Sequence, residues 1–127
     1  MQEHHLFEYA VIRVVPRVER EEFLNVGVIV YCNGRKFLKS IFKIDEKRIS
    51  CFSPDLDVAE LLQNLQAFER ITAGEKDSGP IACLDSASRF RWLTATRSTV
   101  LQTSKVHPGF CKEPEETLKK LYSDLVL

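Results

Sequence analysis

Three strand-forming segments near the amino terminus constrain the fold more than any other feature. EYAVIRVV at 8–15 and NVGVIVYC at 25–32 are rich in β-branched residues, and Asn33-Gly34 separates the second from RKFLKSIF. Such side chains favour strands, and Asn-Gly between two runs is the strongest short-range signal for a hairpin with a type I′ turn. The first segment is apolar on both faces except at Arg13, which is typical of a central strand.

After these strands the spacing of apolar residues becomes helical. Val58, Leu61, Leu65 and Phe68 recur three or four residues apart after Asp57, and Gly74 suits a helix end. The later chain predicts a short helix, a strand that stops at Pro108-Gly109, and a terminal helix, over residues 86–94, 99–106 and from 114 onward. We therefore predict an α+β fold in a single domain, residues 1–127, with a small, mostly antiparallel sheet of about four strands and helices packed mainly on one face.

Composition is that of an ordinary globular protein. The 127 residues are 44% hydrophobic and 28% charged, and the formal net charge is zero, so the whole molecule has no general attraction to nucleic acid or anionic lipid. No apolar run approaches the roughly 20 residues of a membrane span, and MQEHHLFEY does not resemble a signal peptide. We expect a cytoplasmic protein without membrane association. Its four cysteines lack any CxxC pair, which favours free thiols.

One segment combines positive charge with hydroxyl groups. Residues 86–110 hold four Lys and Arg and no acid, and include the turn TATRST. An arginine fork together with hydroxyls and turn amides can hold a phosphate, a carboxylate or a charged partner. Alternatively, Arg97 pairs with an acid elsewhere and the hydroxyls cap local backbone groups. Arg13, inside an apolar strand, also needs water, an acid or a ligand. The candidate anion- or partner-binding residues are Arg13, Arg91, Arg97, Ser98, Thr99, Gln102, Lys105 and His107.

Signals for catalysis or cofactors are weak. His4 and His5 are adjacent and His107 is remote, none at zinc-site spacing from a cysteine, and the glycines form no phosphate-binding loop. We therefore predict no metal and no cofactor, and a protein that is more a binder than an enzyme. Two alternatives stay open. One is an enzyme that acts on a phosphate-bearing substrate through Arg97 and His107. The other is single-stranded nucleic-acid binding by stacking on Trp92, which the lack of a broad basic face disfavours.

Three blocks of the chain resemble a known bacterial family. They are YAVIRVVPRVEREEFLNVGVIVYC at 9–32, LQAFERITAG at 65–74 and RFRWLTATRSTVLQTSKVHPG at 89–109. In order and spacing they are similar to the family known as domain of unknown function 3037. The resemblance implies no activity and no assigned site residues. It does imply a partner, because similar proteins are often encoded beside a HipA-like serine/threonine kinase of the toxin–antitoxin type. We therefore expect a binding or regulatory module for such a kinase.

Overall fold

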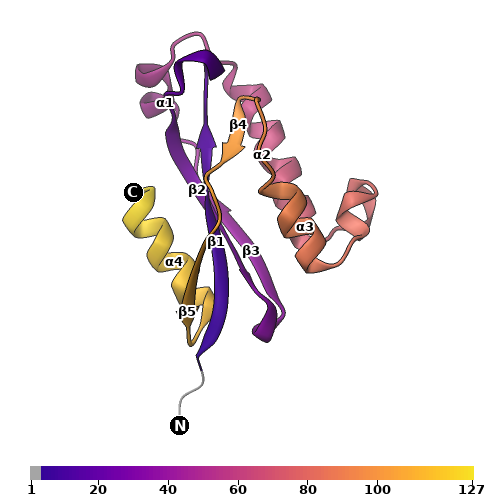
Figure 1. Ribbon diagram of the computed structural model, residues 1–127. Coiled ribbons are helices and arrows are strands. Elements are labelled where there is room, and N and C mark those ends of the chain that lie inside the picture. Colours follow the sequence, from indigo (N-terminus) through magenta and orange to yellow (C-terminus); the bar gives the residue numbers. More distant parts are fainter. Residues whose placement is uncertain (1–3) are drawn as a thin grey trace.

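The computed structural model describes residues 4–127, which form five strands and four α-helices (Figure 1). The strands are β1 (His5–Val14), β2 (Leu24–Cys32), β3 (Phe37–Phe42), β4 (Leu101–Thr103) and β5 (His107–Cys111). The helices are α1 (Glu46–Phe52), α2 (Val58–Ala73), α3 (Ser86–Leu93) and α4 (Pro114–Leu125). Within the described residues, no helix is long and apolar enough to cross a membrane.

All strand pairs are antiparallel, and β1 is central as predicted. The sheet order is β3-β2-β1-β4, and β5 pairs with β1 on the same side as β4. Thus β4 lies opposite the second half of β1, with Ile12 facing Thr103, and β5 lies opposite the first half, with Tyr9 facing His107. The α+β class with a mostly antiparallel sheet is confirmed.

The strand predicted over 99–106 contains only β4, and after an interruption the chain forms a further strand, β5, that was not predicted. At the interruption the Ser104 amide donates to the Val11 carbonyl, and the Ser104 hydroxyl accepts from the Val11 amide, each at 2.8 Å. The serine side chain thereby satisfies a buried backbone group that a regular ladder would have paired. The prediction that Pro108-Gly109 ends the strand was wrong, because both residues lie inside β5. Proline is tolerated there because β5 borders the sheet.

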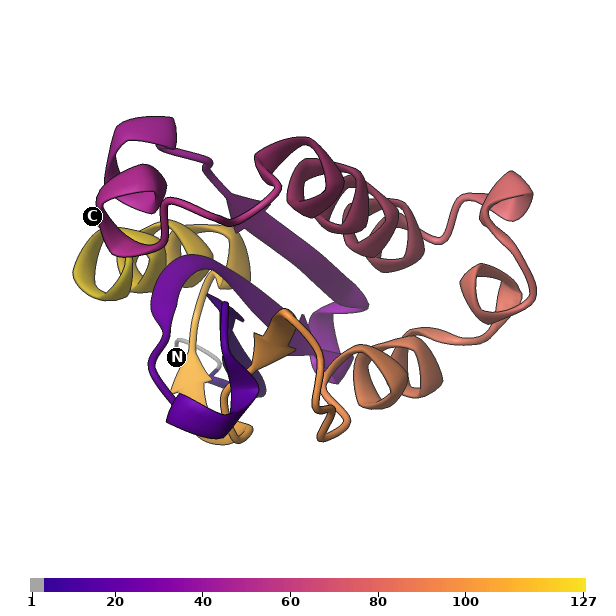
Figure 2. The same cartoon turned by 90° about the horizontal axis from the view of Figure 1, so that it is seen from above.

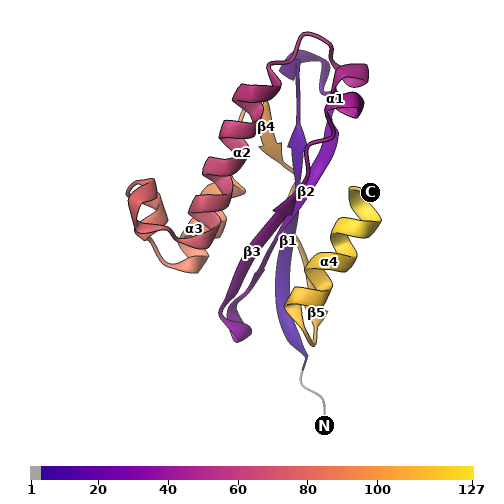
Figure 3. The same ribbon diagram turned by 180° about the vertical axis from the view of Figure 1, so that it is seen from behind.

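Helices cover both faces of the sheet and create two cores. Helices α2 and α3 pack on one face, where Ile12, Ile29, Leu65 and Phe90 belong to one buried cluster. Helix α4 packs on the other face, where Leu118 is fully buried in a second cluster with strand residues of β1, β2 and β5. The sheet therefore lies between α4 and the pair α2 and α3, as Figure 2 shows from above and Figure 3 from behind.

The β2–β3 hairpin is present, but its turn is not the predicted type I′ turn. Cys32 pairs with Phe37, which leaves a loop of four residues, and Lys36 rather than the Asn-Gly pair takes the left-handed conformation, with φ of 50°. Four-residue loops commonly form around a type I turn. Gly34 lies close to the His5 side chain, since a Cβ at this position would lie 3.0 Å from Nδ1 of His5.

Local capping explains where the helices begin and end. The Asp57 carboxylate accepts from the Glu60 amide at the start of α2, and Gly74 ends that helix with φ of 71°. Asp85 caps α3 in the same way by accepting from the Ser88 amide at 2.8 Å. Helix α1 was not predicted from the sequence, although Asp45 caps it by the same rule.

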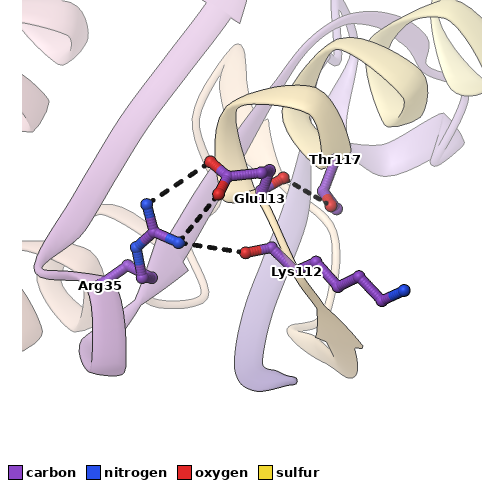
Figure 4. Close-up of polar contacts among 4 residues, drawn as sticks. All are labelled: Arg35, Lys112, Glu113 and Thr117. Carbon is purple, nitrogen blue, oxygen red and sulfur yellow. Dashed lines mark hydrogen bonds and ion pairs between the residues drawn. The ribbon is translucent and has the colours of Figure 1, made fainter. Parts of the chain in front are cut away.

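The amino end of α4 is tied to the β2–β3 loop (Figure 4). Arg35 donates to both carboxylate oxygens of Glu113, at 3.0 and 3.5 Å, and to the Lys112 carbonyl at 3.2 Å. The Thr117 hydroxyl donates to the Glu113 carbonyl at 3.2 Å, and this carbonyl also accepts from the Thr117 amide at 3.1 Å. These contacts fix the helix on its face of the sheet.

Candidate binding groove

A cavity of about 620 Å³ lies on the α2–α3 face. Helix α2 forms one wall, the end of α3 and the loop after it form the second, and β4 forms the third. We call this cavity the α2–β4 groove. Its apolar lining is Leu56, Leu61, Ala67, Phe68, Ile71, Trp92, Leu93, Val100 and Leu101, and its polar lining is Asp57, Glu60, Asn64, Arg97, Thr99, Gln102 and Thr103.

Helix α2 lines the groove because the sheet does not cover all of its apolar side chains. Leu61, Leu65 and Phe68 are buried against the strands, whereas Ile71 is only partly buried and lines the groove. Glu60 lies in the first turn of the helix and is exposed at the groove. Acidic residues in the first turn are favoured by the positive end of the helix dipole. The groove therefore has an apolar floor and an acidic end.

Arg97 is the best-anchored polar residue of the groove. Its guanidinium donates to the Leu93 carbonyl at 2.9 Å and to the Trp92 carbonyl, and it stacks on the Trp92 ring with its centre 4.4 Å from the ring centroid. The last carbonyls of a helix lack partners within the helix, and a cation at that end also complements the dipole. Burial lowers the pKa of Arg97 from its ordinary value. Arg97 thus holds the end of α3.

Hydroxyl and amide side chains of the loop before β4 bond to local backbone groups. The Thr94 hydroxyl donates to the Phe90 carbonyl, and the Thr99 hydroxyl donates to the Leu101 carbonyl, each at 2.8 Å. The Gln102 amide donates to the Thr99 carbonyl at 2.7 Å. These hydroxyl groups therefore bond to local backbone groups, as the alternative interpretation of the sequence expected. Arg97 also bonds to backbone carbonyls, and not to an acidic side chain.

The structure divides the predicted site residues into two groups. Arg97, Thr99 and Gln102 line the α2–β4 groove together. The other five, which do not line it, are Arg13, Arg91, Ser98, Lys105 and His107. Of these five, Arg91, Ser98, Lys105 and His107 are exposed. The basic segment therefore does not converge on one point.

Arg13 and His107 each have an aromatic neighbour instead of a shared cleft. Ile12 and Val14 point into the α2–α3 core, so the Arg13 side chain between them points to the opposite face of the sheet. Its guanidinium lies 3.9 Å from the centroid of the Phe23 ring, and burial lowers its pKa. The His107 ring lies 5.3 Å from the Tyr9 ring. Neither residue faces the groove.

Comparison with known protein families agrees with this fold unit. The model of the family described as "Protein of unknown function (DUF3037)" matches residues 9–126. The chain belongs to the DUF3037 family. Neither a curated protein nor a solved structure matches the chain. The matched residues include every element that forms the walls of the groove, so the groove belongs to the DUF3037 unit itself.

Sequence reasoning missed the α2 wall of this DUF3037 groove. Glu60 and Asn64 are one helical turn apart and line the groove, and neither was among the site residues predicted from the sequence. Their position beside the apolar stripe is the signal that could have found them, because residues at i and i+4 lie on one side of a helix. Trp92, which is 42% exposed, is a second signal of the groove. A large aromatic side chain that stays exposed beside a groove is typical of a contact surface.

Proposed function

We propose that this DUF3037 protein is a non-enzymatic binding or regulatory module, and that its partner is a HipA-like serine/threonine kinase. The α2–β4 groove is the observation that carries the binding role. This cavity of about 620 Å³ is formed by two helices and a strand, and the partly exposed Trp92 lines it. Concave, mostly apolar sites with a few fixed polar groups are the usual form of binding sites in proteins. The kinase as partner rests on the family resemblance.

The chemistry of the groove favours binding over catalysis. Both terminal nitrogens of Arg97 already donate to backbone carbonyls, so this residue gives little free capacity for a substrate phosphate. His107 packs against Tyr9 and does not line the groove. The remaining exposed basic residues, Arg91 and Lys105, and the exposed Ser98 suit the periphery of a contact with a larger partner. We place the kinase contact over the groove and this adjoining segment.

The test is direct binding of the purified protein to a purified HipA-like serine/threonine kinase, measured by calorimetry. We expect Trp92→Ala to weaken binding about tenfold or more, since aromatic anchors dominate binding energies. Phe110→Ala is the matched control, because Phe110 is 74% exposed on β5 and does not line the groove. No binding of the wild type at micromolar concentration would refute the kinase partnership. Equal losses for the two variants would move the contact away from the groove.

A further inference from the structure

Strand β4 borders the sheet and has one side without a strand partner. It is the last strand in the order β3-β2-β1-β4, and within residues 4–127 only β1 pairs with it. In Figures 1 and 3 it lies on the side of the sheet that carries α2. Unpaired strand edges offer amide and carbonyl groups that can pair with another chain. The α2–β4 groove runs along this strand.

The hydrogen bonds to β1 show which groups of β4 point outward. The Val100 carbonyl accepts from the Val15 amide at 2.7 Å, and the Ser104 amide donates to the Val11 carbonyl. Because bonding directions alternate along an antiparallel pair, the backbone groups of the intervening Leu101 and Thr103 point away from β1. The Thr99 hydroxyl already bonds the Leu101 carbonyl, so it caps one of these groups. The amide and carbonyl of Thr103 lie beyond the reach of this cap.

The side chains of the groove specify what could pair there. Leu101 and Thr103 share a sheet face with Ile12 and Val14, which is the face toward α2. Alternate side chains of a strand added beside β4 would point the same way, onto the apolar floor of the groove. A bound helix could not use the outward backbone groups, whereas an extended segment could pair with those that Thr99 does not cap. The groove therefore favours an extended segment with apolar residues at every second position.

The charged residues of the groove indicate which charge a bound segment should carry. The Asp57 carboxylate is occupied as the cap of α2, but Glu60 is exposed at the groove and its carboxylate has no ion pair within residues 4–127. Arg97 is engaged with the carbonyls of α3. The free charge of the groove is thus negative, which complements a Lys or Arg in the segment and disfavours an acidic or phosphorylated one.

We propose that the α2–β4 groove binds an extended, alternately apolar segment of a partner protein, with a basic residue near Glu60, as an additional strand beside β4. This deepens the proposed function by giving its mode of contact, although it does not require that the partner be the kinase. Main-chain bonds to Thr103 supply affinity, and the groove selects the alternate side chains.

The test uses a phage-displayed library of random dodecapeptides, selected on the full-length protein. Peptides that bind are labelled, and their affinities are measured by fluorescence polarisation for the wild type and two variants. Thr103→Pro removes the outward amide, which an edge strand tolerates, and Thr103→Val retains that amide and the shape of the side chain. We expect Thr103→Pro to weaken binding about tenfold, the effect of one lost hydrogen bond that leaves its partner unpaired, and Thr103→Val to bind like the wild type.

A second measurement does not depend on the folding of a variant. Hydrogen exchange of the wild type, followed by NMR, should slow at the amides of Leu101 and Thr103 when a selected peptide binds. The strand-addition proposal is overturned if no peptide is enriched, if Thr103→Pro binds as well as Thr103→Val, or if these two amides gain no protection. If the protein binds peptides but not the kinase, only the proposed kinase partnership is refuted. If Thr103→Pro does not weaken kinase binding, only the proposal that the partner adds a strand beside β4 is refuted.

Discussion

The two faces of the sheet differ in how their helices are fastened. Helix α4 is tied near both ends, because Arg35 and Lys39 pair with Glu113 and Glu115 in its first turn. At its other end, the carbonyl of Leu125, the last helical residue, accepts from the Asn25 side chain, and the carbonyl of Val126 accepts from the Arg48 side chain. Helix α2 has no such fastening on the side of the groove, since no hydrogen bond or ion pair within residues 4–127 joins it to β4.

This difference separates a face built for stability from a face that is open for contact. A helix held by polar contacts at both ends keeps its apolar stripe against the sheet, and the cavity lined by Tyr122 and Val126 on the α4 side has a volume of only about 70 Å³. The α2 side leaves partly buried apolar groups along one border. Removing side chains from the two faces should therefore have unequal consequences, which the following predictions measure.

The largest effect should come from the core of the closed face. Leu118→Ala removes a fully buried side chain of α4 and should lower the free energy of unfolding by about 3 kcal/mol. Ile71→Ala, on α2, should cost about 1 kcal/mol, because this side chain is partly exposed at the groove and leaves no closed cavity. Urea unfolding of both variants checks the comparison. Equal losses would mean that the α2 face is packed as tightly as the α4 face.

The junction between β4 and β5 should show the next largest effect. Ser104→Ala leaves the buried Val11 amide without its side-chain acceptor and should cost about 2 kcal/mol. Ser98→Ala, six residues earlier on the exposed loop, should stay within about 0.5 kcal/mol of the wild type. Thermal unfolding of the two variants measures the difference. A stable Ser104→Ala protein would indicate that another group takes over the Val11 amide.

The sequence predicted the sheet well where local rules act. The apolar residues on both faces of β1 indicated a central strand, and Asp57 and Gly74 bounded α2 almost to the residue. Local rules failed where a partner distant in the sequence decides the structure. The turn after Cys32 follows the register with β3 and the approach of His5 to Gly34, and Pro108 enters a strand because its amide side faces no neighbour.

The candidate site could be predicted only in part for the same reason. Three of the eight predicted residues, Arg97, Thr99 and Gln102, do line the groove, since they lie in one segment that folds back beside β4. Arg13 was separated from them by the alternation of β1, which points it to the other face. The α2 wall lies about forty residues earlier in the sequence, and only the packing of α2 on the sheet brings Glu60 opposite Arg97 across one cavity.

A smaller effect is expected at the border of the groove. Arg97→Ala removes the cation that holds the end of α3 and should lower the free energy of unfolding by about 1 kcal/mol. Arg97→Lys should recover only part of this loss, because an ammonium cannot bond two carbonyls and stack on Trp92 at once. Arg91→Ala is the control, since Arg91 is an exposed residue of α3, the helix whose end Arg97 holds. Emission of Trp92, the single tryptophan, should shift in Arg97→Ala and not in Arg91→Ala.

The smallest effect concerns the fastening of the closed face itself. The Arg35–Glu113 pair is 41% and 53% exposed, so Arg35→Ala should cost only about 0.5 kcal/mol, and added salt should reduce the difference. Arg17→Ala breaks the still more exposed pair with Glu19 and should change stability less. Yet hydrogen exchange in the first turn of α4 should accelerate in Arg35→Ala alone, because this pair holds one end of the helix while the apolar stripe holds the rest. If exchange there is unchanged, the hydrophobic cluster alone keeps α4 on the sheet, and the openness of the α2 face must then come from its side-chain shapes rather than from missing polar ties.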